Sequence, residues 1–404
     1  MSFAVSKANG GEPGGNDATA DDLFGFDLVS LVSSAAQLRT SKTAFVQAAP
    51  VPDSANAGNS DIDYTSLRTL VNSYASAFRA FGLQPGERIL IAGCLGVRAQ
   101  AALISGLAAG LDTAVAGVHL DASDLGNFAR LTGAVAVVTE VCAAQSGAAS
   151  QILSAAAQAD AVRLVISLSD DAPDGTVPMG AAGAASGRTP NLQRSPRILT
   201  RTLNGKLAAH SQQTLIAAGL DLIARTRISA GAPIVSTIVP ASFAGLVCGP
   251  VAALLSGAPL VLHAPFDSKT LLQRIRELRP VQLMIPAAIS AHLAASTVFN
   301  STHLSALIVL SRFEGNPSAL EAPPAPVIQA ENVDICDLVA WDETALAAHC
   351  RGQDGAPGTP LTENHVIQVG GRNILAVRAV RHFLNNNGTS ATAIAFDGEA
   401  VSVD

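Results

Sequence analysis

The sequence has few aromatic and few charged residues. Aromatic side chains make up 4% of the 404 residues, with one Trp and two Tyr, and charged residues make up 14%. Nucleic-acid-binding proteins usually display clusters of Lys and Arg interleaved with aromatic residues. This chain has no such cluster and a net charge of −7. The composition therefore argues against nucleic-acid binding.

Cysteine is also scarce. The five cysteines are Cys94, Cys142, Cys248, Cys336 and Cys350. Their odd number and the absence of CxxC spacing argue against a disulfide framework and a zinc site, so reduced thiols in a cytoplasmic protein are expected. Cys248 lies in the apolar stretch LVCGPVAALL with no adjoining basic residue, which predicts a core residue rather than a nucleophile. The eight histidines show no metal-ligand spacing, so no metal site is predicted.

Long uninterrupted hydrophobic runs are missing. No stretch of about 18 apolar residues is free of polar residues, Gly or Pro, so no transmembrane helix is expected. The first 22 residues lack the basic start and apolar centre of a secretory signal and are expected to form a flexible leader. What the chain does have is 49% hydrophobic residues, enough for large buried sheets covered by helices.

Helix-like and strand-like segments alternate along the chain. In 63–81 the apolar residues recur every three or four positions, which predicts one amphipathic helix. Short apolar strands are expected at 88–92, 164–168, 234–240, 259–265, 281–286 and 304–311. Such alternation is typical of an α/β fold with mainly parallel sheets and helices on both faces.

Changes in composition divide the chain. We expect the leader at 1–22, a first α/β subdomain at 23–197, a second at 198–350 and a small β-rich subdomain at 351–404. The last of these is predicted from short alternating segments such as HVIQVGG and NILAVRAV.

Two segments resemble the large N-terminal domain of the adenylate-forming superfamily, which contains acyl- and aryl-CoA ligases. DYTSLRTLVNSYASAFRAFGLQPGERILIAG (63–93) is similar to the family's opening segment, tY-x-x-L followed by LG-x-x-GD-x-V. Residues 240–293 resemble the stretch that follows the family's nucleotide loop. The resemblance begins near residue 30 and implies two doubly wound subdomains plus a small C-terminal β-rich subdomain.

The family's phosphate loop, TSGTTG-x-PKG, resembles ILTRTLNGKLAAHSQQ (198–213) only in part. Backbone N–H groups, hydroxyls and a Lys hold the ATP phosphates in such loops. Here the Pro-Lys-Gly end is missing, and Leu203 adds bulk where a hydroxyl belongs. We expect a degenerate loop whose remnant is Thr200, Arg201, Thr202, Asn204, Gly205 and Lys206.

Three other family motifs are altered. The acidic YG-x-TE motif, which helps to hold magnesium and adenine, is expected near VIQAENVDICDL, where Glu331 or Asp334 supplies the carboxylate. The pocket motif H-x-x-G has become SFAG, so the acyl-pocket region is assigned to Ser242, Phe243 and Gly245. DGEAVSVD at the end resembles DG-x-x-x-TGD, which assigns the ribose contact to Asp404.

The altered motifs leave three functional hypotheses. The first is a catalytically inactive relative of AMP-forming carboxylate–CoA ligases, without cofactor and without the mobile C-terminal catalytic domain, acting as a binding or scaffold subunit beside another protein. The alternative is an active AMP-forming ligase of acyl or aryl carboxylates, or a half-ligase completed by a separate chain, that uses ATP and Mg through Arg201, Lys206, Glu331, Asp334 and Asp404. The weaker alternative is an acyl or acyl-CoA sensor.

Overall fold

The computed structural model describes residues 27–47, 61–93, 96–117, 120–182, 194–263, 267–294, 298–313, 328, 333–343, 345–351 and 366–368. The helices are α1 (Leu28–Leu38), α2 (Tyr64–Ala80), α3 (Val97–Ala108), α4 (Ala122–Thr132), α5 (Ser146–Ala157), α6 (Gln212–Thr226), α7 (Phe243–Leu246), α8 (Ala252–Ser256), α9 (Ser268–Leu278) and α10 (Ala287–Ala294). A π-helical turn, Val247–Val251, joins α7 to α8.

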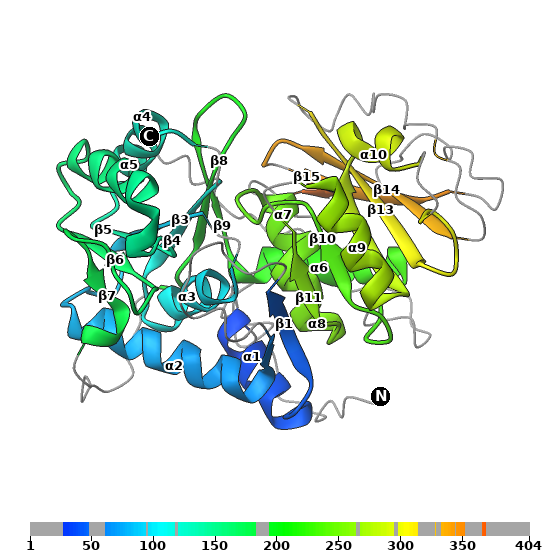
Figure 1. Ribbon diagram of the computed structural model, residues 1–404, viewed down its shortest axis with the longest axis horizontal. Coiled ribbons are helices and arrows are strands. Elements are labelled where there is room, and N and C mark those ends of the chain that lie inside the picture. Colours follow the sequence, from blue (N-terminus) through cyan, green and yellow to red (C-terminus); the bar gives the residue numbers. More distant parts are fainter. Residues whose placement is uncertain are drawn as a thin grey trace, which may run out of the picture.

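The strands form two sheets (Figure 1). One contains β7 (Val177–Pro178), β6 (Leu164–Ser167), β5 (Ala136–Thr139), β3 (Arg88–Ala92), β4 (Asp112–Ala116), β8 (Ile198–Arg201) and β9 (Leu207–His210), in that order. The other contains β16 (Val366–Gln368), β15 (Ala345–Cys350), β14 (Asp334–Trp341), β13 (Leu304–Phe313), β12 (Val281–Pro286), β10 (Ile234–Ser236), β11 (Leu260–Leu262), β1 (Thr43–Gln47) and β2 (Asp61–Asp63). The central pairs of both sheets are parallel, and antiparallel pairs occur only toward their edges. The predicted α/β class is confirmed.

Side-chain alternation explains how the helices cover the first sheet. Ile89 and Ile91 of β3 face the large central core, which includes α2 and α3, whereas Leu90 and Ala92 face a smaller core beneath α4 and α5. Successive residues of a strand point to opposite faces, so a fully apolar strand such as β3 requires helices on both sides.

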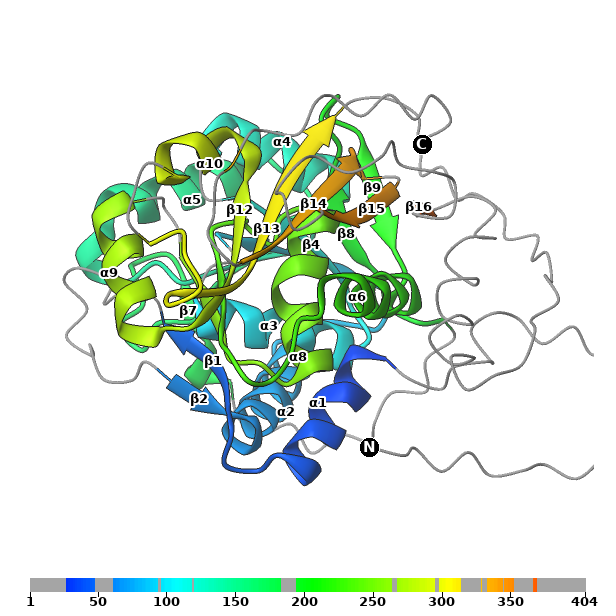
Figure 2. The same ribbon diagram turned by 90° about the vertical axis from the view of Figure 1, so that its right-hand side faces the viewer.

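The second sheet follows the same rule. Ile234 and Leu260 face the central core with α6 and α8, while Val235 and Val261 face a separate core beneath α9. The central core therefore contains side chains of both sheets. Figures 1 and 2 show the two sheets and the helices beside them from two directions.

Helix α2 illustrates how local sequence sets an element's limits. The Asp63 carboxylate accepts a hydrogen bond from the Ser66 N–H at 2.7 Å and caps the first turn. Gly82, with φ +78°, follows the last turn in the left-handed conformation that ends helices. Between them Leu67 and Phe78 are buried on one face, as the apolar spacing predicts.

The two sheets do not follow the predicted subdomain limits, because each contains strands from the other predicted subdomain. Strands β8 and β9, expected in the second subdomain at 198–350, pair with the first sheet through β4. Conversely β1, within the predicted first subdomain, pairs with β11 of the second sheet. Of the predicted β-rich subdomain at 351–404, only residues 351 and 366–368 are described.

One cysteine prediction is wrong. Cys336 of β14 and Cys350 of β15 stand directly opposite each other in an antiparallel pair and form a disulfide. Their pairing depends on how β14 and β15 align, which a separation of 14 residues does not reveal. Cys142 and Cys248 are free and buried, as expected.

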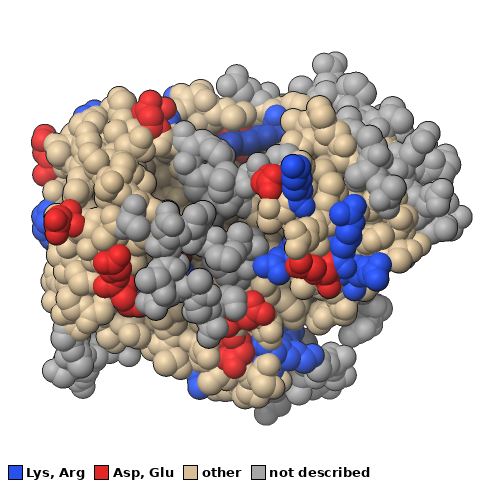
Figure 3. Space-filling model, viewed as in Figure 1, with Lys and Arg blue, Asp and Glu red and all other residues tan. Residues whose placement is uncertain are grey.

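The face of the molecule that Figure 3 draws is sparsely charged where its residues are described. On the face drawn in Figure 3, Lys and Arg are interspersed with Asp and Glu, and uncharged surface predominates. Within the described ranges, no helix is both long and apolar enough to cross a membrane.

Candidate functional site

The segment predicted as a phosphate loop is a β-hairpin. Strands β8 and β9 pair in antiparallel fashion, with Thr200 opposite Ala208 and Arg201 opposite Leu207. Residues 202–206 connect them, and Gly205 has φ +82°. Residues with a side chain rarely adopt this backbone conformation, so Gly205 is required by the turn itself.

The backbone N–H groups of the turn already have partners inside the protein. The Thr202 N–H donates to the Lys206 carbonyl at 2.9 Å, and the Gly205 N–H donates to the Thr202 carbonyl at 3.0 Å. The Lys206 N–H donates to the Thr202 hydroxyl at 2.8 Å, and the Leu203 N–H donates to Asp342 Oδ1 at 2.8 Å. Loops that hold phosphate do so through N–H groups that point into a shared concavity. Each of these four N–H groups instead points at an oxygen atom of the protein.

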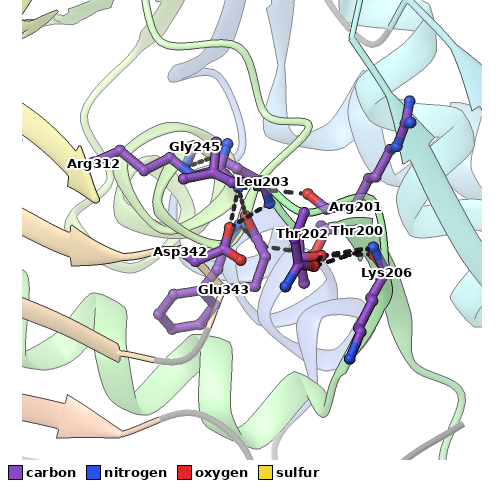
Figure 4. A network of polar contacts seen from close by, with 12 residues as sticks. Thr200, Arg201, Thr202, Leu203, Lys206, Gly245, Arg312, Asp342 and Glu343 are labelled. Carbon is purple, nitrogen blue, oxygen red and sulfur yellow. Dashed lines mark hydrogen bonds and ion pairs between the residues drawn. The ribbon is translucent and has the colours of Figure 1, made fainter. Parts of the chain in front are cut away.

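Arg201, the last residue of β8, and Lys206 of the turn direct their cationic side chains away from Asp342 and Glu343. Arg201 pairs with Asp124 of α4, with 3.4 Å between Nη1 and Oδ1. Figure 4 shows Arg201 and Lys206 extending away from the carboxylates of Asp342 and Glu343. The hydroxyl of Thr202 donates to Asn204 Oδ1 at 2.6 Å, so the Asn204 side chain stabilises the turn.

Behind the hairpin lies a buried carboxylate, Glu343, just beyond the end of β14. Its Oε2 accepts hydrogen bonds from the Thr200 hydroxyl at 2.7 Å and from the Phe243 N–H at 2.6 Å. His210 Nε2 is 2.6 Å from Thr200 Oγ1 and 3.3 Å from Glu343 Oε2. Because the Thr200 hydroxyl donates its one hydrogen to Glu343, the Nε2 atom of His210 must carry the hydrogen that binds Thr200 Oγ1.

The opposite oxygen of Glu343 is bound by an arginine. Arg312, near the end of β13, donates from Nη2 to Glu343 Oε1 at 2.5 Å and to Asp342 Oδ1 at 2.8 Å. The same nitrogen is 3.4 Å from the Arg201 carbonyl oxygen. Figure 4 shows the Arg312 side chain reaching from β13 to these oxygens. One guanidinium therefore connects β13, the hairpin and the residues after β14.

The predicted acyl-pocket residues form the start of α7. Ser242 caps this helix, because its hydroxyl accepts a hydrogen bond from the Gly245 N–H at 3.1 Å. A side chain at Gly245 would collide with the Val239 carbonyl oxygen. The Phe243 ring lies 5.2 Å from the His210 ring, measured between centroids. The structure therefore brings Ser242, Phe243 and Gly245 next to Thr200, and the Glu343 carboxylate links the two segments.

The other predicted residues are not brought to this network. Asp334 is exposed and begins β14, whereas Glu343 follows its far end. At about 3.3 Å per strand residue the two are separated by roughly 25–30 Å along the chain. Glu331 and Asp404 lie outside the described residues.

The acidic segment ENVDICDLVAWDE (331–343) is a candidate for a metal or ribose contact from its sequence, but Glu331 and Asp334, not Asp342 and Glu343, are the residues named within it. Sequence reasoning missed His210 and Arg312. A pattern that favours the acidic pair was present, because Asp342 and Glu343 directly follow the apolar run that ends at Trp341. Side chains that follow parallel strands at their carboxyl ends commonly form sites. We therefore place the acidic part of the candidate site at 342–343.

The oxygens around Glu343 are of the type that Mg²⁺ prefers, but their arrangement does not fit the ion. Both Glu343 oxygens already accept hydrogen bonds, and Arg312 lies between Glu343 and Asp342. In the part of the chain that the structure describes, no group of three or more His, Cys, Asp or Glu residues is arranged to hold a metal. We derive no step through a metal ion.

Comparisons with known proteins agree on the fold. Residues 32–200 match the family model described as AMP-binding enzyme. A benzoate CoA ligase from Burkholderia xenovorans LB400 superposes with a TM-score of 0.61 and 19% identity, covering 78% of this chain and 61% of that one. The anthranilate CoA ligase AuaEII, solved with anthranoyl-AMP, superposes with a TM-score of 0.64 and 13% identity. The match covers 86% of this chain and 64% of that one.

A third structure, MatB from Rhodopseudomonas palustris with ATP bound, gives a TM-score of 0.59 and 18% identity, covering 86% of this chain and 65% of that one. This chain thus spans less than two thirds of the length of these three structures. No curated protein matches the sequence. The predicted resemblance in fold to the large N-terminal domain of adenylate-forming enzymes is confirmed.

Proposed function

We propose that this chain, which has the fold of the large domain of adenylate-forming ligases, is a catalytically inactive relative of AMP-forming carboxylate–CoA ligases. In this proposal it acts as a binding or scaffold subunit of a larger, cytoplasmic protein assembly and uses neither ATP nor Mg. The partner is another protein, and an acyl or aryl carboxylate is the class of small ligand that the fold suggests.

The observation that supports this proposal is the hydrogen bonding of the 202–206 turn. The N–H groups of Thr202, Leu203, Gly205 and Lys206 each donate to an acceptor of the protein itself. Adenylation builds negative charge on a phosphorus with five ligands, and one properly directed donor to such charge is commonly worth about 10²–10³ in rate. A turn that satisfies its own donors provides little of this stabilisation.

The direct test is nucleotide binding and partial-reaction chemistry with the full chain. We expect no heat on calorimetric titration with millimolar Mg-ATP and no carboxylate-dependent exchange of pyrophosphate into ATP across a panel of acyl and aryl carboxylates. Binding at micromolar strength, or exchange above the carboxylate-free blank, would overturn the proposal. Thr200→Ala is the control for any exchange found, because a contaminating ligase is unaffected by that change.

A second candidate, an active AMP-forming ligase or half-ligase, is favoured by one specific contact. Thr200, which stands in the loop similar to the phosphate loop, is hydrogen-bonded to the buried carboxylate of Glu343. The neighbouring structures named above are ligases, and one was solved with ATP. This candidate predicts exchange activity once a separate chain supplies the remaining domain, so the exchange assay repeated with candidate partners separates the two proposals.

The acyl or acyl-CoA sensor remains the third candidate. It predicts that acyl compounds bind in the absence of nucleotide. Ligands that bind only the folded protein raise its melting temperature, and the rise grows with the logarithm of the ligand concentration once this exceeds Kd. A thermal-shift series with acyl-CoA, free acids and CoA alone tests it. Equal melting temperatures across the series would remove this candidate.

A further inference from the structure

We propose that Arg312 is a built-in cation for the acidic pair Asp342 and Glu343, and that it keeps divalent metal ions out of this site. The inference rests on the proposed function, since it explains how a site of this fold exists without Mg. It concerns the metal alone, so it can be tested without nucleotide.

Charge balance is the first argument. The Glu343 side chain is fully buried and that of Asp342 is 13% exposed. Buried carboxylates are stable only when a cation or several donors compensate for the lost hydration. Arg312 contacts both carboxylates, and a guanidinium keeps its charge at every pH at which proteins are folded.

His210 also lies beside Glu343, with 3.3 Å between Nε2 and Oε2. Its Nδ1 atom is buried without a hydrogen-bond partner among the described residues. Arg312, in contrast, contacts both carboxylates of the pair and is the cation that this inference assigns to them.

Position is the second argument. Mg²⁺ binds its ligands at about 2.0–2.1 Å and needs both carboxylates to turn toward it. Arg312 Nη2 already lies 2.5 Å from Glu343 Oε1 and 2.8 Å from Asp342 Oδ1. A metal that reached both oxygens would have to displace this nitrogen (Figure 4).

Arg312 is also linked to the hairpin turn through Asp342. Asp342 Oδ1 accepts from Arg312 and, at 2.8 Å, from the Leu203 N–H of the turn. Displacing Arg312 would therefore disturb the turn as well as the acidic pair. This coupling raises the free energy needed to exchange the guanidinium for a metal.

The test is binding of Mn²⁺, a paramagnetic substitute for Mg²⁺, to the full-length chain without nucleotide, followed by electron paramagnetic resonance. The wild type and Arg312→Lys should bind no Mn²⁺ in the low millimolar range. Arg312→Gln should bind it on the order of 10²-fold more tightly, because repulsion between two cations about 4 Å apart near a protein surface is at least that large. Arg276→Gln, which removes an exposed charge from α9, is the matched control and should resemble the wild type.

Mn²⁺ binding to the wild type as tight as to Arg312→Gln would overturn the inference. A folded Arg312→Gln variant that still binds no Mn²⁺ would also overturn it, because Arg312 would then not be what excludes the ion. If Arg312→Gln does not fold, the wild type and Arg312→Lys decide: Mn²⁺ binding to either overturns the inference, and its absence from both supports it.

The outcomes separate this inference from the proposed function. A wild type that binds ATP but no Mn²⁺ would overturn the proposed function and leave Arg312 as the resident cation. A wild type that binds Mn²⁺ but no ATP would overturn only the inference about Arg312.

Discussion

Glu343 connects three parts of the chain through one carboxylate. It accepts hydrogen bonds from Thr200 of the hairpin, Phe243 of α7 and Arg312 of β13. These donors stabilise a carboxylate with no exposed surface, because each replaces hydration lost on folding. Its role in this structure is therefore structural as well as electrostatic.

Replacing Glu343 with Ala should lower the free energy of unfolding by about 3–5 kcal/mol, the usual cost of removing one partner from a buried ion pair. Urea unfolding followed by the fluorescence of Trp341, the single Trp of the chain, measures it. The matched control is Glu277→Ala on the exposed side of α9, which should change stability by less than about 0.5 kcal/mol. Equal effects of the two substitutions would contradict the prediction.

Burial makes Cys248 an inert thiol. Loss of hydration raises its pKa to about 12, whereas an ordinary cysteine ionises near pH 8.5. The reactive thiolate therefore appears in the folded protein only as the pH approaches 12. We expect iodoacetamide to leave Cys248 unmodified between pH 7 and pH 9 by peptide mass spectrometry, and to modify it in denaturant. A rise in native labelling across pH 8–9 would refute this.

At the scale of elements, the start of α7 depends on a close approach between backbones. A Cβ atom at Gly245 would overlap the carbonyl oxygen of Val239, which cannot move as a flexible side chain does. The position therefore requires Gly for space, although its φ lies outside the left-handed range.

Gly245→Ala should cost about 1–3 kcal/mol of stability, the usual range for overpacking in a core. Gly180→Ala is the matched control, because a Cβ there meets nothing within 4 Å, and it should lie within about 0.5 kcal/mol of the wild type. Chemical denaturation of both variants measures the difference. A Gly245→Ala protein as stable as the control would show that the backbone near Val239 yields easily.

The helices and strands can be predicted from the sequence, whereas the candidate site can be predicted only in part. Helix α2 and strand β3 follow from apolar spacing, and Gly205 follows from the turn that it makes. Similarity predicts a carboxylate of the acidic motif at Glu331 or Asp334, because it identifies a segment and not which end of a strand reaches the site. The partnership of Arg312 with Glu343 depends on the parallel alignment of β13 and β14, which local sequence does not encode.

At the scale of the whole molecule, the central core contacts both sheets. Ile91 of the first sheet and Leu260 of the second belong to the same cluster of buried side chains, which also includes Phe78 of α2. Residues that share one core lose their packing together. The two sheets are therefore expected to unfold as one cooperative unit.

This expectation has a simple measurement. Trp341 reports on the second sheet, whereas far-ultraviolet circular dichroism reports on all helices and strands. Coincident urea midpoints from the two probes are expected for cooperative unfolding. Two separated midpoints would mean that each sheet is stable without the other.

The disulfide between Cys336 and Cys350 has a consequence for folding errors. Sliding β15 by one residue along β14 would exchange the two faces of β15. Leu346 and Ala348, which belong to the central core, would then turn away from it. A covalent bond between the opposite residues Cys336 and Cys350 prevents this shift. The oxidised chain therefore cannot form the misfolded state in which β15 is shifted by one residue.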